Sequence, residues 1–194
     1  MRYMKRFIVA AMLLASFGVA QEKGAKKGGP SLAAMMNLKV ADYADGGRIP
    51  DKNTCVAGPA SVSPAISWSG APASTASYAV ILHDPDAVLG GAASSDVLHW
   101  GLFDIAGDAK GLPEGVKNGD QADGAKHISN ITGGPGYFGP CAPAGHGDHH
   151  YMLEVFALNA KLGLPASTSR ADLMSAMNGK VVGKGVYVGI FGRK

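Results

Sequence analysis

Histidine and aspartate side chains gather in one glycine- and proline-rich stretch, GYFGPCAPAGHGDHHY, at positions 136–151. Imidazole and carboxylate groups are ligands that zinc and copper accept, so His146, Asp148, His149 and His150 could hold a metal. However, the stretch has neither H-E-x-x-H nor C-x-x-C spacing, and its ligand types match no fixed coordination framework. We therefore expect no metal site and no cofactor.

The same stretch can instead form the wall of an anion site. Its glycines allow unusual backbone angles and its prolines fix others, so the loop is stiff and its N–H groups can converge on negative charge. On an extended strand, His149 and Tyr151 face the same side and His150 faces the other. The pattern favours a shaped receptor loop that delivers one histidine and one tyrosine to a pocket.

A second polar group follows the apolar run SYAVIL at 77–82, where the chain reads His83-Asp84-Pro85-Asp86. Proline holds the two carboxylates in a defined direction, and such a loop can bind a metal, hold an acid for proton transfer, or simply make a turn. His99 stands beside a tryptophan at the start of another apolar run. That histidine could line a pocket or pack in the core.

An enzyme is the alternative that these residues leave open. Asp84 and His149 could form an acid/base pair for a hydrolase. The sequence shows no G-x-S-x-G elbow and no obvious nucleophile beside them. A binding site without turnover is the simpler interpretation.

Short strands are the elements that would position these residues. Apolar runs broken by turn residues predict strands at 37–43, 65–69, 77–83, 98–105, 151–158 and 185–191. One helix is expected late in the chain, where Ser169 and Asp172 resemble a capping box, Leu173, Met174 and Met177 share a face, and Asn178-Gly179 ends it. The pattern indicates a mainly β fold of antiparallel strands with a peripheral helix.

The N-terminus has the pattern of an export signal. Residues 1–20 combine a basic head, an apolar run at 7–17 and small residues at 18–20, which is typical of a secretory signal peptide. Residues 21–36 are rich in lysine, glycine and alanine and read as a flexible linker. The domain itself is expected at 37–194, and the protein is expected to be periplasmic or secreted.

Removal of the signal changes the charge balance. The whole chain has 18 Lys+Arg and 15 Asp+Glu, and Arg2, Lys5 and Arg6 fall in the signal together with no acid. The mature chain is therefore neutral, so the clustered positive charge that nucleic-acid binding needs is missing. No segment after the signal has the length and apolar character of a transmembrane helix.

Cys55 and Cys141 are the two cysteines of the chain. Export takes them to an oxidising compartment, where a pair of cysteines most simply forms a disulfide. Two buried free thiols are the alternative, because sequence alone does not show whether the residues lie within bridging distance.

Several of these segments, taken in order, resemble the phosphatidylethanolamine-binding protein family and, within it, the bacterial Raf-kinase-inhibitor-like branch. The resemblance runs from about Leu38 to Arg193. It rests on SVSPAISWSGAP (61–72), HDPDA (83–87), LHWGLFDI (98–105), GYFGPCAPAG…HHY (136–151) and VGIFGR (188–193). Each motif is weak alone, and their fixed order is specific.

The resemblance implies a central antiparallel β-sandwich, a smaller sheet, one or two peripheral helices and a pocket for anionic groups such as phosphate or phosphorylethanolamine. Matching the motifs position by position implies these ligand-binding residues: Asp84, Asp86, His99, Gly136, Gly139, Pro140, His149 and Tyr151. Histidine N–H groups, a tyrosine hydroxyl and rigid loop amides can hold an oxyanion. Asp84 would then orient a histidine or accept a hydrogen bond from a protonated ligand.

The sequence departs from the family at the rim of this pocket. Val88 stands where the family usually has a proline, and the small-residue segment LGGAASSD follows at 89–96. His150 replaces an arginine of the usual H-R-Y. These changes bear on ligand preference rather than on the fold, and His146 and His150 match no pocket position of the family.

The sequence therefore favours an exported protein that binds a small anionic ligand and modulates another protein without catalytic turnover. An exported small hydrolase or a protease inhibitor that uses the same pocket is the alternative. A protein partner, if there is one, is not identified by the sequence.

Overall fold

The structure is a computed structural model that describes residues 33–91 and 93–194. The expected signal peptide at 1–20 and most of the expected linker at 21–36 lie outside the described residues. No helix among the residues described is long and apolar enough to cross a membrane.

Strands make up most of the regular structure, accompanied by short 3-10 helices and an α-helix. In chain order the elements are β1 (Ala34–Met35), β2 (Asn37–Val40), β3 (Gly47–Arg48), η1 (Asp51–Asn53), η2 (Cys55–Ala60), β4 (Ile66–Ser69), β5 (Ser77–Asp84), η3 (Pro85–Gly91), β6 (Val97–Ala106), β7 (Gly111–Leu112), β8 (Lys126–His127), β9 (His149–Leu158), α1 (Arg170–Met177) and β10 (Val181–Phe191).

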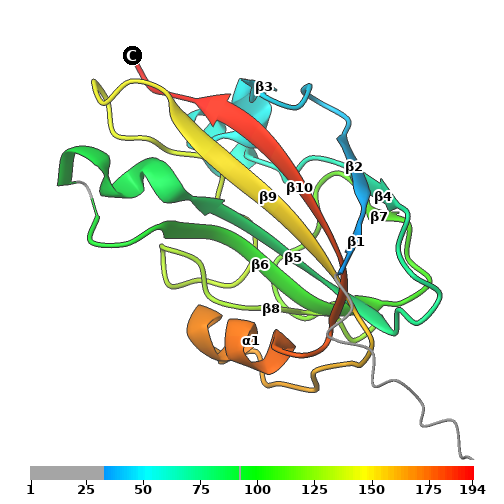
Figure 1. Cartoon of the computed structure of the whole chain (residues 1–194). Helices are drawn as coiled ribbons and strands as arrows, with labels where there is room; N and C mark the ends of the chain where they lie inside the picture. The colour runs from blue at the N-terminus through cyan, green and yellow to red at the C-terminus, as the bar shows by residue number, and fades with distance from the viewer. Residues whose placement is uncertain (1–32, 92) are drawn as a thin grey trace, which may run out of the picture. The chain divides into compact units, whose positions relative to one another are not determined.

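The strands form two sheets. The larger sheet has the order β1-β10-β9-β5-β6-β8, with β3 also paired to β10, and the smaller sheet has the order β2-β4-β7 (Figure 1). The long strands pair antiparallel, whereas the two-residue strands β1 and β3 run parallel to β10. The expected sandwich with a smaller sheet is confirmed, and the larger sheet is mixed at one edge rather than purely antiparallel.

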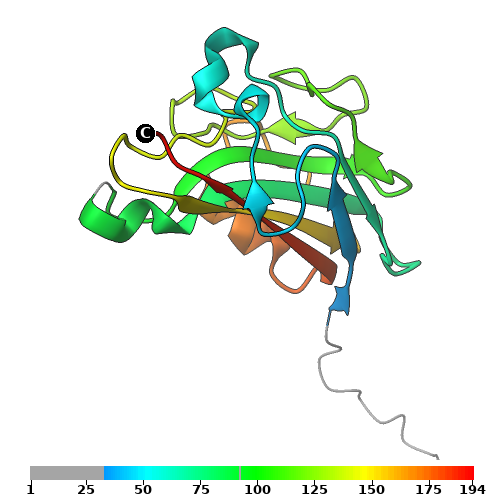
Figure 2. The ribbon, with the colours of Figure 1, turned by 90° about the horizontal axis from the view of Figure 1, so that it is seen from above.

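Both faces of the larger sheet are covered. On one face, Tyr78, Val80 and Leu82 of β5 pack against the smaller sheet through residues such as Trp68. On the other face, Ala79 and Ile81 pack toward α1 (Figure 2). Every residue of β5 is buried as a result. This explains why the sequence of that strand is almost continuously apolar rather than alternating.

The predicted strands are all present, and their ends differ from the predictions. β2 ends at Val40 because its partner strand β4 begins at Ile66, which pairs with Val40. β10 begins at Val181, four residues before the predicted start, because Val181–Lys184 continue the pairing with β9. β1 lies at residues assigned to the linker, and its pairing with β10 brings Ala34 and Met35 into the sheet.

The predicted helix is confirmed with one correction. The Ser169 hydroxyl caps α1 by accepting a hydrogen bond from the Asp172 N–H at 3.1 Å, and Leu173 and Met177 are buried. Met174, predicted to share their face, is 41% exposed. One residue step rotates a helix by about 100°, so Met174 lies at the edge of the buried face rather than on it.

Candidate functional site

Most of the predicted ligand-binding side chains lie at the end of the sandwich where β5 ends and β6 begins. A cavity of about 310 Å³ opens there. Asp84 and His99 line it, together with the apolar side chains of Ala87, Val97 and Ile131. The loop at 136–148 adds Phe138, Cys141 and Pro143 as a further wall. The cavity is therefore a mostly apolar hollow with one carboxylate and one imidazole.

A β-bulge brings His99 to the same face as Asp84. Along β5 and β6, Leu82 pairs with Trp100 but His83 pairs with Leu98, so His99 is the extra residue without a partner opposite. Strict alternation would turn either His99 or Trp100 away from the space between the sheets. The bulge lets both side chains point there, which is a common use of bulges beside functional sites.

Asp84 is a buried carboxylate with one oxygen satisfied and one left open. Its Oδ2 lies 2.9 Å from His149 Nδ1, and both side chains are at most 4% exposed. Its Oδ1 is buried and makes no hydrogen bond of good geometry to a described residue, and the Tyr151 hydroxyl is the donor nearest to this carboxylate. Because Asp84 borders the cavity, a ligand there can supply the missing donor.

His99 is fixed by the loop that follows β8. Its Nδ1 lies 3.1 Å from the carbonyl oxygen of Phe138 and 3.2 Å from that of Gly139, so this nitrogen donates its proton to the loop backbone. The ring stacks on Phe138 and meets Tyr151 edge-on, with centroids 5.6 and 5.2 Å away. Nε2 is therefore the nitrogen available to a ligand.

Burial controls the charge of His99. Desolvation lowers the pKa of this imidazole, and it outweighs the opposing effects of the Phe138 carbonyl and the Asp84 carboxylate. At neutral pH the cavity thus presents a neutral imidazole whose Nε2 is a hydrogen-bond acceptor. Negative charge brought close to Nε2 would raise the pKa and favour protonation there.

Tyr151 holds the 136–148 loop through a hydrogen bond. Its hydroxyl accepts a hydrogen bond from the Cys141 backbone N–H at 3.1 Å, and its side chain is completely buried. Burial, and then the Asp84 charge, raise the pKa of this phenol, so it stays protonated. As the sequence predicts, His149 and Tyr151 face inward while His150 is exposed.

The glycines and the proline of the loop shape the wall rather than line the cavity. Gly136 has a φ of +106°, and a Cβ there would collide with the Asn118 side chain. A Cβ on Gly139 would lie 2.7 Å from backbone atoms of Thr54. Pro140 accepts a hydrogen bond from the Cys55 N–H at 3.1 Å. The loop therefore lies directly against the segment that begins η2.

The disulfide between Cys55 and Cys141 joins these two segments, as predicted. The Cα atoms are 5.3 Å apart, and the bridge spans 86 residues of sequence. Together with the backbone contacts of Pro140 and Gly139, it holds the loop in place before any ligand arrives.

Asp86 lies at the rim and does not line the cavity. Its Oδ2 accepts hydrogen bonds from the backbone N–H of His150 at 2.9 Å and from that residue's Nδ1 at 2.7 Å. Burial acts to raise the pKa of Asp86, but these bonds outweigh it and lower the pKa. The structure thus gives Asp86 a role in joining η3 to β9.

His83 belongs to a different face. It precedes Asp84 on β5 and so points away from the cavity, where its Nδ1 lies 2.7 Å from Asp96 and its Nε2 3.5 Å from Glu154. The apolar lining residues were not predicted as site residues. Ile131 and Val97 carry no chemical signal of their own, and only the fold brings them beside Asp84.

Comparison with known proteins identifies the family. The family model described as phosphatidylethanolamine-binding protein matches residues 39–192. A UPF0098 protein of Methanothermobacter thermautotrophicus is 38% identical over 159 residues, covering 81% of this chain and 99% of that protein. The chain belongs to the phosphatidylethanolamine-binding protein family. The crystal structure of E. coli YbcL, described as a member of the mammalian PEBP family, has a TM-score of 0.71 and 26% identity and covers 82% of this chain and 99% of YbcL.

Within the phosphatidylethanolamine-binding protein family, one relative bears on location. LppC of Mycobacterium tuberculosis, a candidate lipoprotein by its name, is 35% identical over 149 residues, covering 77% of this chain and 68% of LppC. The name of that relative is compatible with export.

The disulfide is expected to contribute strongly to stability. Replacing both cysteines (Cys55→Ser with Cys141→Ser) should lower the free energy of unfolding by about 3–5 kcal/mol, because the bridge closes a long loop in the unfolded chain. Urea denaturation of the mature protein with and without reductant measures this. The double variant should be insensitive to reductant, and equal stability of the two proteins would contradict a structural role for the bridge.

The pKa of His99 is expected to lie below the ordinary histidine value of about 6.5. Since the unfolded chain binds this proton first as the pH falls, the stability that depends on neutral His99 is lost progressively below about pH 6.5. NMR titration of the imidazole measures the pKa directly.

A His99→Gln variant assigns the imidazole signal and separates its effect from that of His127, whose pKa burial also lowers. A measured His99 pKa at or above the ordinary value would contradict the neutral imidazole.

Proposed function

We propose that this member of the phosphatidylethanolamine-binding protein family is an exported protein that binds a small anionic ligand of the phosphate or phosphorylethanolamine type. The ligand occupies the cavity of Asp84 and His99. Binding proceeds without catalytic turnover, and the complex modulates another protein. The family's name, the motif positions and the polar groups of the cavity support this proposal.

The open oxygen of Asp84 is the observation that carries the proposal. A buried acceptor without a donor costs about 1–3 kcal/mol, more when it is charged. Asp84 Oδ1 has no hydrogen bond of good geometry within the described residues, and it lies beside a cavity of about 310 Å³. A ligand that brings a donor removes this cost, which makes an ammonium group or a protonated phosphate oxygen the favoured partner.

His99 favours negative charge on the same ligand. Its Nδ1 proton is committed to the loop carbonyls, so a proton taken up at Nε2 creates a charged donor that faces the cavity. An anionic oxygen at Nε2 stabilises that charged form and raises the pKa. Binding of an anion should therefore be coupled to proton uptake by His99.

Phosphorylethanolamine carries both complementary groups. Its ammonium matches the acceptor oxygen of Asp84, and its phosphate matches protonated His99. Inorganic phosphate offers a weaker version of the same match through its own hydroxyl. This pairing explains how a cavity that contains a carboxylate can still select an anionic compound.

The lining supports binding rather than turnover. Among the described residues that border the cavity, none offers a hydroxyl, a free thiol or an amine as a nucleophile, because Cys141 is part of the disulfide. The apolar walls of Val97, Ile131 and Phe138 provide shape without reactive groups. No observation favours the hydrolase or protease-inhibitor alternatives over this proposal.

Export is proposed from the N-terminal pattern. Residues 1–20 have the basic head, apolar run and small-residue exit of a signal peptide. The disulfide fits an oxidising compartment, where such bonds persist. The protein would therefore act in the periplasm or outside the cell.

Calorimetric titration of the mature protein with phosphorylethanolamine and with phosphate tests the proposal. Saturable binding is expected, tighter for phosphorylethanolamine. His99→Ala should weaken binding about tenfold or more, since it removes a charge-assisted hydrogen bond. His149→Ala should also weaken binding, because Asp84 loses the partner that orients it.

His150→Ala is the matched control, because His150 is the neighbouring histidine on the exposed side of β9. It should bind like the wild type. Absence of saturable binding by the wild-type protein would refute the proposed ligand class. Titration in buffers of different ionisation enthalpy should also reveal proton uptake that His99→Ala abolishes.

A further inference from the structure

A second cavity lies at the opposite end of the sandwich. It has a volume of about 330 Å³ and is formed between β4, the turn that follows it, and the beginning of β5. Tyr78 borders this cavity and Asp84 borders the first, and both point to the same face of β5. They are six residue positions apart along the strand, which corresponds to about 20 Å. The second cavity is therefore a separate site.

Two aromatic rings make up the inner wall of this cavity. The ring centroids of Trp68 and Tyr78 are 5.0 Å apart at 50°, and the residues are only 4% and 1% exposed. The indole N–H of Trp68 donates to the Ala109 carbonyl at 3.1 Å, which fixes the ring. A rigid aromatic wall of this kind binds a flat apolar group at little entropic cost.

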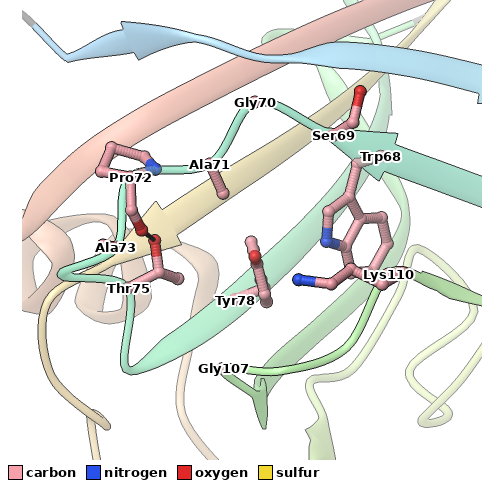
Figure 3. A pocket seen from close by; sticks show the side chains of 10 residues that line it. All are labelled: Trp68, Ser69, Gly70, Ala71, Pro72, Ala73, Thr75, Tyr78, Gly107 and Lys110. Carbon is pink, nitrogen blue, oxygen red and sulfur yellow. Dashed lines mark hydrogen bonds between the residues drawn. The ribbon is translucent and has the colours of Figure 1, made fainter.

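The turn at 70–75 closes the cavity on another side. The Thr75 hydroxyl donates to the Pro72 carbonyl at 2.7 Å, and the Thr75 N–H donates to the same oxygen at 3.0 Å (Figure 3). Proline and these paired bonds make the turn stiff. The cavity is thus largely preformed, as small-ligand sites usually are.

Lys110 provides a single positive charge. Figure 3 shows its amine pointing toward Tyr78, across the space beside Trp68. None of the described residues that line the cavity carries a carboxylate. Lys110 also takes part in no ion pair within the described part of the chain. Its charge is therefore available to an incoming ligand.

We propose that this cavity binds a small organic anion, with a flat apolar body against Trp68 and Tyr78 and its carboxylate at Lys110. The volume is near the lower end of the range for small-ligand sites, about 300–1,000 Å³. It suits a compound with one ring. The proposal is independent of the ligand assigned to the Asp84 cavity.

NMR of the tryptophan indole groups tests the proposal with benzoate as the probe. The chain has two tryptophans, so two indole N–H signals are expected. Benzoate in low-salt buffer should shift the Trp68 signal saturably and leave that of Trp100 in place. Acetate, which has the charge without the ring, and benzyl alcohol, which has the ring without the charge, should bind more weakly.

Substitutions of Lys110 and of a lysine outside the cavity separate the effect of the Lys110 charge from a general change in the charge of the protein. Lys110→Met should weaken benzoate binding about fivefold, at the upper end of what an exposed ion pair contributes, and Lys110→Arg should restore it. Lys117→Met removes an exposed lysine that does not line this cavity and should change nothing. Asp84→Asn should also leave the benzoate affinity unchanged, which keeps this test separate from that of the first cavity.

A Trp68 signal that does not shift saturably would overturn the proposal, as would equal shifts of both indole signals. Unchanged affinity in a folded Lys110→Met protein would likewise overturn it. The wild-type titration decides the matter if that variant does not fold.

Discussion

Burial of the Asp84 carboxylate is the constraint on which the site depends. Removing a carboxylate from water costs several kcal/mol even after the protein relaxes. One oxygen is compensated by His149 at 2.9 Å, and the other has no hydrogen bond of good geometry among the described residues. The fold therefore holds a carboxylate of which only one oxygen makes a good hydrogen bond, at the edge of a cavity that a ligand can enter. Such an arrangement is stable only if its surroundings are rigid.

The surroundings of Asp84 supply that rigidity from several separate segments. The bulge in β6 brings His99 to the cavity, and the carbonyls of Phe138 and Gly139 hold its ring. The disulfide and the close approach of Gly139 to Thr54 hold the loop in turn. His150, where the resemblance to the family leads one to expect an arginine, binds Asp86 on the outer side of β9. This departure from the family therefore alters the rim and leaves the cavity wall intact.

The sequence predicts the long elements well because their signals are local. The apolar run of β5, the serine cap of α1 and the inward pair His149 and Tyr151 each follow from residue spacing. The bulge at His99 depends on the register between two strands, which no single segment encodes. For the same reason the sequence left open whether His99 lines a pocket or packs in the core. The motif alone places Asp86 in the pocket, whereas the bonds that hold it at the rim come from His150, which is distant in sequence.

Other differences arise from pairing between distant segments. β1 forms because β10 offers it an edge, although residues 34–35 carry no strand pattern of their own. Met174 shares its type with the buried residues of α1, but its angular position leaves it partly exposed. The second cavity combines Trp68 and Lys110, which lie far apart in sequence and meet only because β4 pairs with β7.

A crystal structure of the mature protein with phosphorylethanolamine tests the central claim most directly. The account predicts ligand density in the cavity of Asp84 and His99, with the ammonium within hydrogen-bond distance of Asp84 Oδ1 and a phosphate oxygen within that distance of His99 Nε2. An empty cavity at saturating ligand, or density bound only elsewhere on the molecule, would contradict it.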